Sequence, residues 1–195
     1  MVRDRRNKTI DSGGRLPAAV VAFFTLLISL AVPAVAEPRL SPVRRTTIMT
    51  ADPDASLRFW RDLLKFTVEY DVAVDDPGQL ALISPGARRG RAIALRQGDK
   101  LGGSIGLYWT DNVSPAAGAC EQIGRAGAVA VLLLTDDLSS VRKRLTDAGV
   151  GFVTEPVSYN QSRGPTDAFT VFDPNCVRVA FAQIARETFE QSIAK

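Results

Sequence analysis

The same arrangement of residues occurs twice in this chain, and the repeat limits the folds that the chain can adopt. An apolar segment, 43–50 in the first copy and 128–135 in the second, ends near an aspartate that can cap a helix. A short amphipathic helix is predicted next, over 53–65 and 138–149. A repeated unit of this kind usually buries its apolar face only against its neighbour, so we expect the two copies to share one core.

Each copy is predicted to contain a strand, a helix and three more strands. The later strands are expected at 66–74, 91–96 and 104–109 in the first copy, and at 151–157, 168–172 and 177–182 in the second. Two such units give eight strands and two main helices, which is an α+β fold. Curved sheets of this type enclose a groove, which is the usual place for a small-molecule ligand.

The first 36 residues have the parts of an export signal. Five basic side chains lie before residue 16, an apolar stretch covers 18–32, and Ala34-Val35-Ala36 has the form of a signal peptidase site. We therefore predict a signal peptide over 1–36, cleaved after Ala36, and a periplasmic or secreted protein that is free of the membrane. The alternative is an uncleaved membrane anchor over 17–36.

Removing that segment changes the charge of the chain. The whole sequence has 24 basic and 21 acidic residues, of which five and two lie in 1–36, so the remainder carries 19 of each. This balance does not favour nucleic acid or an anionic membrane as a partner.

Beyond the leader, the chain is long enough for one domain with a hydrophobic core. Its predicted parts are a lead-in (37–42), a domain (43–183) and a C-terminal tail (184–195). The domain consists of a first module (43–112), a connector (113–127) and a second module (128–183). Cys120 and Cys176 could be joined in an exported protein, but two separate buried thiols are the alternative.

The chain contains no histidine. Ser-His-Asp and Cys-His arrangements are therefore impossible, and acid–base chemistry would have to use other side chains. No pair of acidic residues is placed so that strand alternation would point both into one cavity. We predict no catalytic residue, and an enzymatic function is not favoured.

Several segments resemble the vicinal oxygen chelate superfamily, which includes glyoxalase I, bleomycin-resistance proteins and extradiol dioxygenases. Residues 52–64 are similar to its D-x-x-x-S-x-x-F-Y-x-x-x-L helix, and the second copy adds 135–138 and 145–150. The turn Phe172-Asp173-Pro174-Asn175 resembles the family's F-x-D-P-x-G, with Cys176 in place of the glycine. The resemblance covers 43–183 and implies two βαβββ modules that form a partly open, eight-stranded barrel around a pocket.

In the enzymes of that superfamily the pocket holds a divalent metal, bound by histidines and glutamates on the first and last strands of each module. The resemblance places these four positions at Arg45, Trp109, Ala130 and Ala180. Alanine and tryptophan offer no suitable donor, and a guanidinium repels a cation. We therefore predict no metal centre and no other cofactor.

Strand alternation suggests which side chains line the groove. Arg45 and Thr47 share one face of the first strand, Leu107 and Trp109 share a face of another, and Arg178 lies on the last strand. If these faces meet, the groove holds two cations, an aromatic plane and apolar walls. That combination is typical of a site for an anionic, partly aromatic small molecule.

Other interpretations remain open. In one, Trp109 belongs to the core, Arg45 and Arg178 pair with acids such as Asp52 or Asp173, and side chains close the groove. The favoured function is an exported, metal-independent protein that binds a small molecule. The alternatives are a metal-dependent lyase or dioxygenase of the glyoxalase or extradiol type, and a non-catalytic scaffold or dimerisation module. The sequence also leaves a homodimer open.

Overall fold

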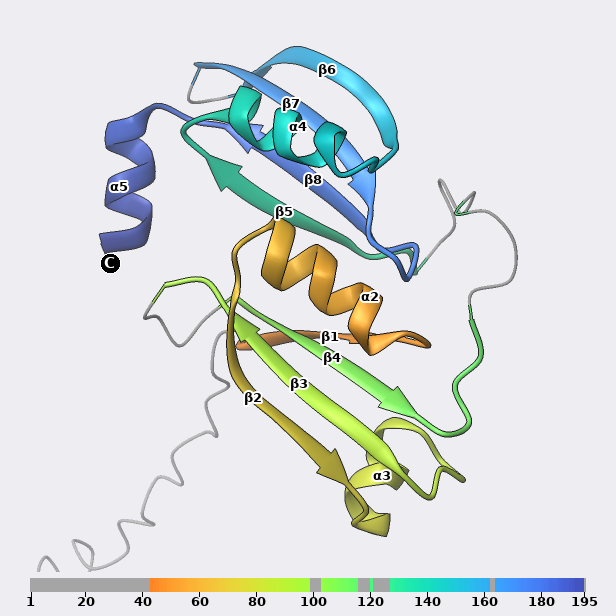
Figure 1. Cartoon of the computed structure of the whole chain (residues 1–195). Coiled ribbons are helices and arrows are strands. Elements are labelled where there is room, and N and C mark those ends of the chain that lie inside the picture. The colour runs from red at the N-terminus through yellow and green to blue at the C-terminus, as the bar shows by residue number, and fades with distance from the viewer. Residues whose placement is uncertain (1–42, 99–102, 116–119, 121–126, 162–163, 195) are drawn as a thin grey trace, which may run out of the picture. The chain divides into compact units, whose positions relative to one another are not determined.

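The computed structural model describes residues 43–98, 103–115, 120, 127–161 and 164–194. The leader and the lead-in lie outside these residues, so they stay predictions. In chain order the elements are β1 (Arg45–Met49), α2 (Pro53–Leu57), the π-helical η2 (Arg58–Leu63), β2 (Thr67–Val74), α3 (Pro77–Ile83), β3 (Gly90–Arg96), β4 (Ser104–Thr110), β5 (Ala130–Thr135), α4 (Leu138–Asp147), β6 (Phe152–Gln161), β7 (Gly164–Phe172), β8 (Arg178–Gln183) and α5 (Arg186–Ala194) (Figure 1).

The strands form two sheets with the same topology, which confirms the predicted duplication and the α+β class. The first sheet has the order β1-β4-β3-β2 and the second has the order β5-β8-β7-β6. In each sheet the first strand of the module runs parallel to the last, and the other neighbours are antiparallel. The two sheets are not closed into a barrel.

Aspartates start the helices of both modules, as the sequence predicts. Asp52 accepts a hydrogen bond from Ala55 N at 2.8 Å, and Asp137 accepts one from Ser140 N at 2.9 Å. Asp76 caps α3 in the same way and has a proline behind it. An aspartate followed by proline favours a helix start, because the carboxylate caps the first turn and proline fits the first helical position.

The two modules share one hydrophobic core, which is the outcome expected from the repeat. Trp60 is fully buried and meets Phe59 and Phe66 edge to face, with ring centroids 5.3 and 5.5 Å apart. The same buried cluster includes Leu107 of the first module and Phe169 of the second. Figure 1 shows α2 between the two sheets, where its apolar residues reach this cluster.

Polar contacts also join the modules. Trp60 Nε1 donates a hydrogen bond to Asp173 at 3.2 Å, and Asn175 Nδ2 donates one to Ser56 Oγ at 2.9 Å. Cys120 and Cys176 form a disulfide, which settles the alternative left open by the sequence. The Asp173–Cys176 turn is therefore held both to α2 and to the connector.

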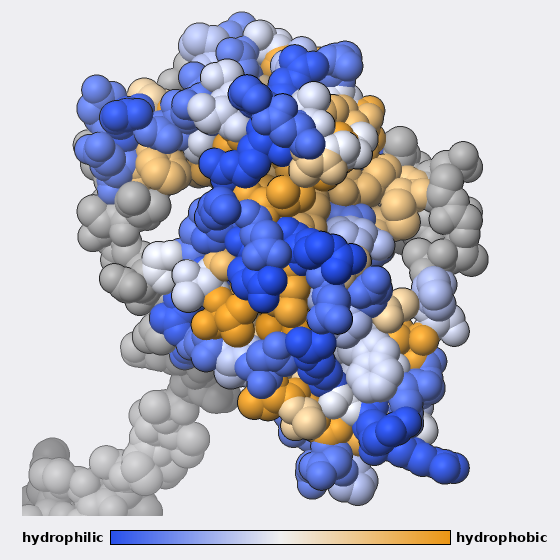
Figure 2. Space-filling model, in the orientation of Figure 1, coloured by the Kyte–Doolittle hydropathy of each residue, from blue (hydrophilic) through white to orange (hydrophobic). Residues whose placement is uncertain are grey.

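The surface in the view of Figure 1 is mostly polar, with separate hydrophobic areas (Figure 2). The second sheet contributes several exposed apolar side chains, among them Leu132, Leu134, Val157 and Tyr159. Within the described residues, no helix has the length and apolar character needed to span a membrane.

Candidate functional site

A row of paired residues crosses the first sheet on the side opposite the shared core. Thr47 on β1 pairs with Gly106 on β4, Gly106 with Ala94 on β3, and Ala94 with Tyr70 on β2. Directly opposed residues point to the same side of a sheet, and so do residues two apart along a strand. Arg45 therefore shares this side, which we call the outer face of the first sheet.

Arg45 lies across the small residues of that row. A Cβ atom at Gly106 would come within 2.7 Å of Arg45 Cδ and 3.0 Å of Thr47 Oγ1, so the glycine leaves the space that the arginine occupies. The guanidinium donates from Nη1 to the Tyr70 hydroxyl, and its central carbon is 5.1 Å from the Tyr70 ring centroid. Arg45 Nε also lies 3.5 Å from Ser104 Oγ.

The positive charge of Arg45 has no carboxylate partner among the residues that the structure describes, and neither has that of Arg178. Asp52 is engaged in capping α2, and Asp173 accepts hydrogen bonds from Trp60 and from its own turn. The interpretation in which these two acids neutralise the arginines is therefore wrong. A guanidinium held by a phenol keeps donors and charge for an anion.

A cavity of about 240 Å³ opens between β1 and β5, the edge strands of the two sheets. Arg45 and Ser104 form part of its wall on the first module, and 130–133 form an apolar wall on the second. Leu132 in that wall is 59% exposed. The wall on the first module also contains Val43 and Ile105, so the cavity is largely apolar with one cation. Such a cavity suits a small molecule with one charged end.

The residues predicted to bind a ligand do not share one surface. Arg45 and Thr47 lie together on the outer face, but Leu107 is 1% exposed in the core. Trp109 lies two residues after Leu107 and so points to the same side. The expectation that Leu107 and Trp109 face the groove with Arg45 is wrong, because the pairing of β1 with β4 sets Arg45 opposite Ser104. Arg178 lies in the second sheet, opposite Ala130.

Sequence reasoning missed Tyr70 and Tyr108, which belong to the outer face. Tyr108 pairs with Met49, two residues after Thr47, and is therefore on the Arg45 side. Because side chains alternate along a strand, the sequence already predicts that Tyr108 and Trp109 point to opposite sides of β4. Only the pairing with β1 could show which of the two faces Arg45.

The positions of the family's metal ligands do not supply a metal site. Arg45 and Ala130 line the cavity, Ala180 lies on β8 beside β5, and Trp109 points to the opposite side of the first sheet. None of these side chains suits a divalent cation. In the described part of the chain, no three histidine, cysteine or acidic side chains are grouped so that they could hold one. The residues present therefore do not fit the metal of the family's enzymes.

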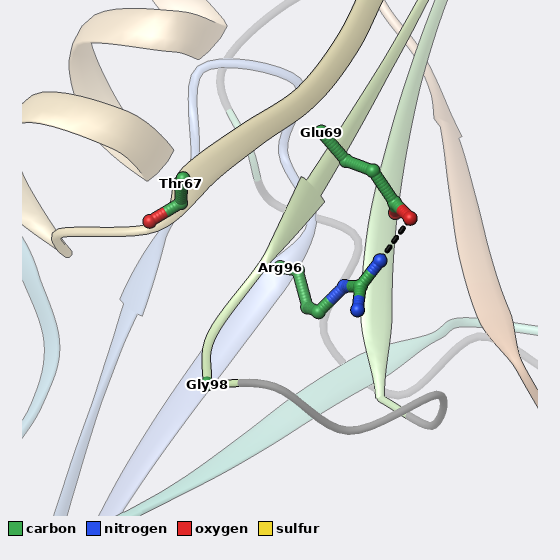
Figure 3. A pocket seen from close by; sticks show the side chains of 4 residues that line it. All are labelled: Thr67, Glu69, Arg96 and Gly98. Carbon is green, nitrogen blue, oxygen red and sulfur yellow. Dashed lines mark hydrogen bonds and ion pairs between the residues drawn. The ribbon is translucent and has the colours of Figure 1, made fainter.

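A second cavity, of about 270 Å³, is lined by Thr67, Glu69, Arg96 and Gly98 (Figure 3). Arg96 forms an ion pair with Glu69 across it. The two charges compensate each other, so this cavity is a weaker candidate for an anion than the one beside Arg45.

A third cavity, also of about 270 Å³, has Lys65 and Arg144 among its lining residues. Arg144 Nη1 donates a hydrogen bond to the carbonyl oxygen of Leu63 at 3.0 Å. This cation satisfies the C-terminal end of η2, which gives it a structural role.

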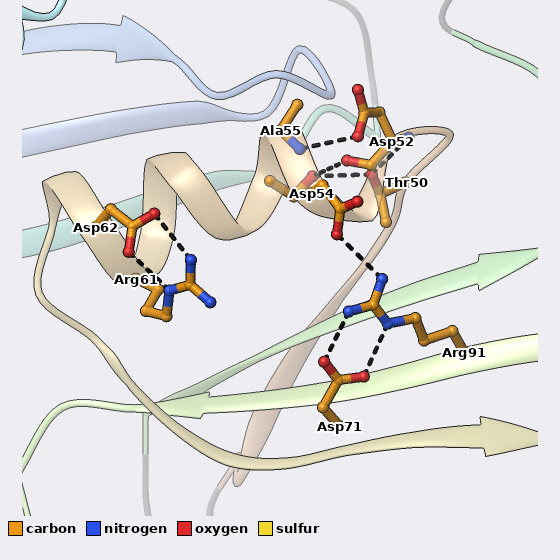
Figure 4. A network of polar contacts seen from close by, with 9 residues as sticks. Thr50, Asp52, Asp54, Ala55, Arg61, Asp62, Asp71 and Arg91 are labelled. Atoms are coloured by element: carbon orange, nitrogen blue, oxygen red, sulfur yellow. Dashed lines mark hydrogen bonds and ion pairs between the residues drawn. The ribbon is translucent and has the colours of Figure 1, made fainter.

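Arg91 attaches α2 to the first sheet (Figure 4). Its Nε and Nη2 atoms each lie 2.8 Å from the Asp71 carboxylate, and Nη1 lies 3.1 Å from Asp54 of α2. The hydrogen bond from Arg91 is the main cause that lowers the pKa of Asp71. Arg91 pairs with Trp109, so this network lies on the helix side of the sheet and not at the Arg45 site.

Comparisons with known proteins agree with the topology. The profile of the Glyoxalase/Bleomycin resistance protein/Dioxygenase superfamily matches residues 43–181. A glyoxalase family protein from Bacillus cereus is 17% identical, with a TM-score of 0.66 over 78% of this chain and 99% of that chain. The trypanothione-dependent glyoxalase I of Leishmania major is 14% identical, with a TM-score of 0.53 over 80% of this chain and 94% of that chain.

At these identities the structures show a common fold and nothing finer. No curated protein matches the chain. The profile match covers most of the chain and agrees with the paired modules and their strand order. The chain therefore belongs to the glyoxalase/bleomycin resistance protein/dioxygenase superfamily.

Proposed function

We propose that this protein binds a small anionic molecule with an apolar or aromatic body, without a metal. The observation that carries the proposal is Arg45, a guanidinium without a carboxylate partner in the described structure, at the wall of a cavity between the modules. The apolar wall of β5 lies opposite and offers a surface to the rest of the ligand.

The residue types support binding rather than metal-dependent lyase or dioxygenase chemistry. The chain has no histidine, and a guanidinium occupies the position of the first metal ligand. A metal-dependent lyase or dioxygenase would need imidazole or carboxylate donors at these positions. The scaffold alternative is less favoured. A scaffold whose groove is filled by side chains would not need a cavity lined by an arginine that has no carboxylate partner in the described structure.

Export is part of this proposal. The apolar leader with its small-residue cleavage site indicates it, and the Cys120–Cys176 disulfide is the type of bond that persists in oxidising compartments. Measuring the mass of the mature protein from its native host tests this point. A start at Glu37 is expected, and an intact leader would favour the membrane-anchored alternative.

The binding test compares Arg45→Met with the unchanged protein. Isothermal titration of EDTA-treated protein with benzoate and 1-naphthoate should show binding, and benzamide, a neutral analogue, should bind more weakly. Loss of one hydrogen-bonded charge typically weakens affinity by about ten- to a hundredfold, and we expect this for Arg45→Met.

Arg58→Met is the matched control, because Arg58 is an exposed arginine on η2 and does not line the cavity. It should leave benzoate affinity unchanged. Equal losses in both variants, or no binding of either acid by the unchanged protein, would contradict the proposal.

A further inference from the structure

Tyr108 carries the only buried side-chain oxygen or nitrogen atom that has no hydrogen-bond partner within the described part of the chain. The residue is 4% exposed. Buried hydroxyls almost always have a partner, because removing them from water without one is costly. Burial is the main cause that raises the pKa of Tyr108, and Tyr70 adds to it, so the hydroxyl is a neutral donor at physiological pH.

The fold places this hydroxyl group with other donors. Tyr108 pairs with Met49 and Ala92, which puts it on the outer face, one row along the sheet from Tyr70. Tyr70 accepts a hydrogen bond from Arg45 and still has its own hydrogen to donate. Tyr70 also packs against the small buried cluster that contains Tyr108.

Small residues lie beneath these donors. Gly106 and Ala94 occupy the middle of the row between Thr47 and Tyr70, and both are buried. A larger side chain at Gly106 would displace Arg45, because a Cβ atom there would lie 2.7 Å from Arg45 Cδ. The sheet is thus shaped so that one guanidinium and two phenols are held on one face.

The charge of this group selects the ligand. Arg45 has no carboxylate partner among the described residues, whereas Arg96, the last residue of β3, forms an ion pair with Glu69. The group therefore offers one net positive charge and hydroxyl donors, which match a monoanion better than a phosphate dianion.

We propose that Arg45, Tyr70 and Tyr108 form a recognition site for a monocarboxylate, in which the Tyr108 hydroxyl donates to a carboxylate oxygen. Arg45 supplies the charge, and Tyr70 positions its guanidinium. This inference rests on the proposed function and assigns the residues and the ligand class. Of the three residues, Arg45 also lines the cavity beside β5, and the apolar body of the ligand is expected to lie there.

Tyr108→Phe tests the inference with benzoate as the probe. The substitution removes one oxygen and keeps the ring, so benzoate affinity should fall about tenfold. The midpoint of thermal unfolding should stay the same or rise, because an unpartnered hydroxyl is removed. Tyr159→Phe on β6 is the matched control and should leave benzoate affinity unchanged. Phenyl phosphate should bind the unchanged protein more weakly than benzoate.

The outcomes separate this inference from the proposed function. Benzoate binding by the unchanged protein with equal affinity in Tyr108→Phe would overturn the Tyr108 assignment and leave the proposed function standing. Failure of the unchanged protein to bind any acid would overturn both. If Tyr108→Phe does not fold, Gly106→Ala is measured in its place. This variant keeps every hydrogen-bond donor but displaces Arg45, so benzoate affinity should fall about tenfold. Unchanged benzoate affinity would refute the site.

Discussion

Loss of the Cys120–Cys176 disulfide is expected to lower the free energy of unfolding by about 4 kcal/mol. The bond joins residues 56 positions apart and restricts the unfolded chain from the connector through most of the second module, up to the turn before β8. Denaturation by urea, compared between the oxidised protein and Cys120→Ser/Cys176→Ser, measures the loss. Cys176 stands where the superfamily pattern that this turn resembles has a glycine, which is consistent with a structural bond.

Two controls make this experiment specific. Dithiothreitol should destabilise the unchanged protein and leave the double serine variant unaffected. Cys176 has φ 63°, a left-handed conformation that glycine adopts without strain. Cys120→Ser/Cys176→Gly should therefore recover about 1 kcal/mol relative to the double serine variant. A double serine variant as stable as the oxidised protein would show that the bond contributes nothing.

Asp173→Ala is expected to lower the free energy of unfolding by about 3 kcal/mol. Asp173 is 3% exposed and accepts hydrogen bonds from Trp60 Nε1 at 3.2 Å and from Asn175 N and Val177 N at 2.8 Å. The alanine leaves these donors without their acceptor, and the Trp60 indole is fully buried. Urea denaturation monitored by tryptophan fluorescence provides the measurement.

Asp147→Ala is the control, because Asp147 forms an exposed ion pair with Lys143 and should change stability by less than about 0.5 kcal/mol. A cycle that combines Asp173→Ala with Trp60→Phe isolates the contact between the modules. If Asp173→Ala costs no more than Asp147→Ala, the turn does not hold the modules together.

Local chemistry made much of this fold predictable. Asp52 and Asp137 cap helices wherever their sequences place them, because the bonds are made within three residues. The spacing of Leu57, Trp60 and Leu64 put all three on one buried helix face. The duplication then predicted two units of four strands each and a shared core.

The site could not be predicted in the same way, because its residues are brought together by contacts between strands that are distant in the sequence. Alternation showed that Leu107 and Tyr108 face opposite ways, but only the parallel pairing of β1 with β4 decides which one joins Arg45. The hydrogen bond from Arg45 to Tyr70 crosses the whole sheet and depends on the small residue at Gly106. The cysteine pair could be recognised as a candidate, but its formation depends on how the connector returns to the Asp173 turn.

Metal content and ligand affinity, measured on the same purified sample, test the central claim most directly. Elemental analysis by mass spectrometry should find no stoichiometric nickel, zinc or iron, and benzoate should bind with the same affinity before and after EDTA treatment. A transition metal bound at one equivalent, whose removal abolishes benzoate binding and whose return restores it, would contradict the account.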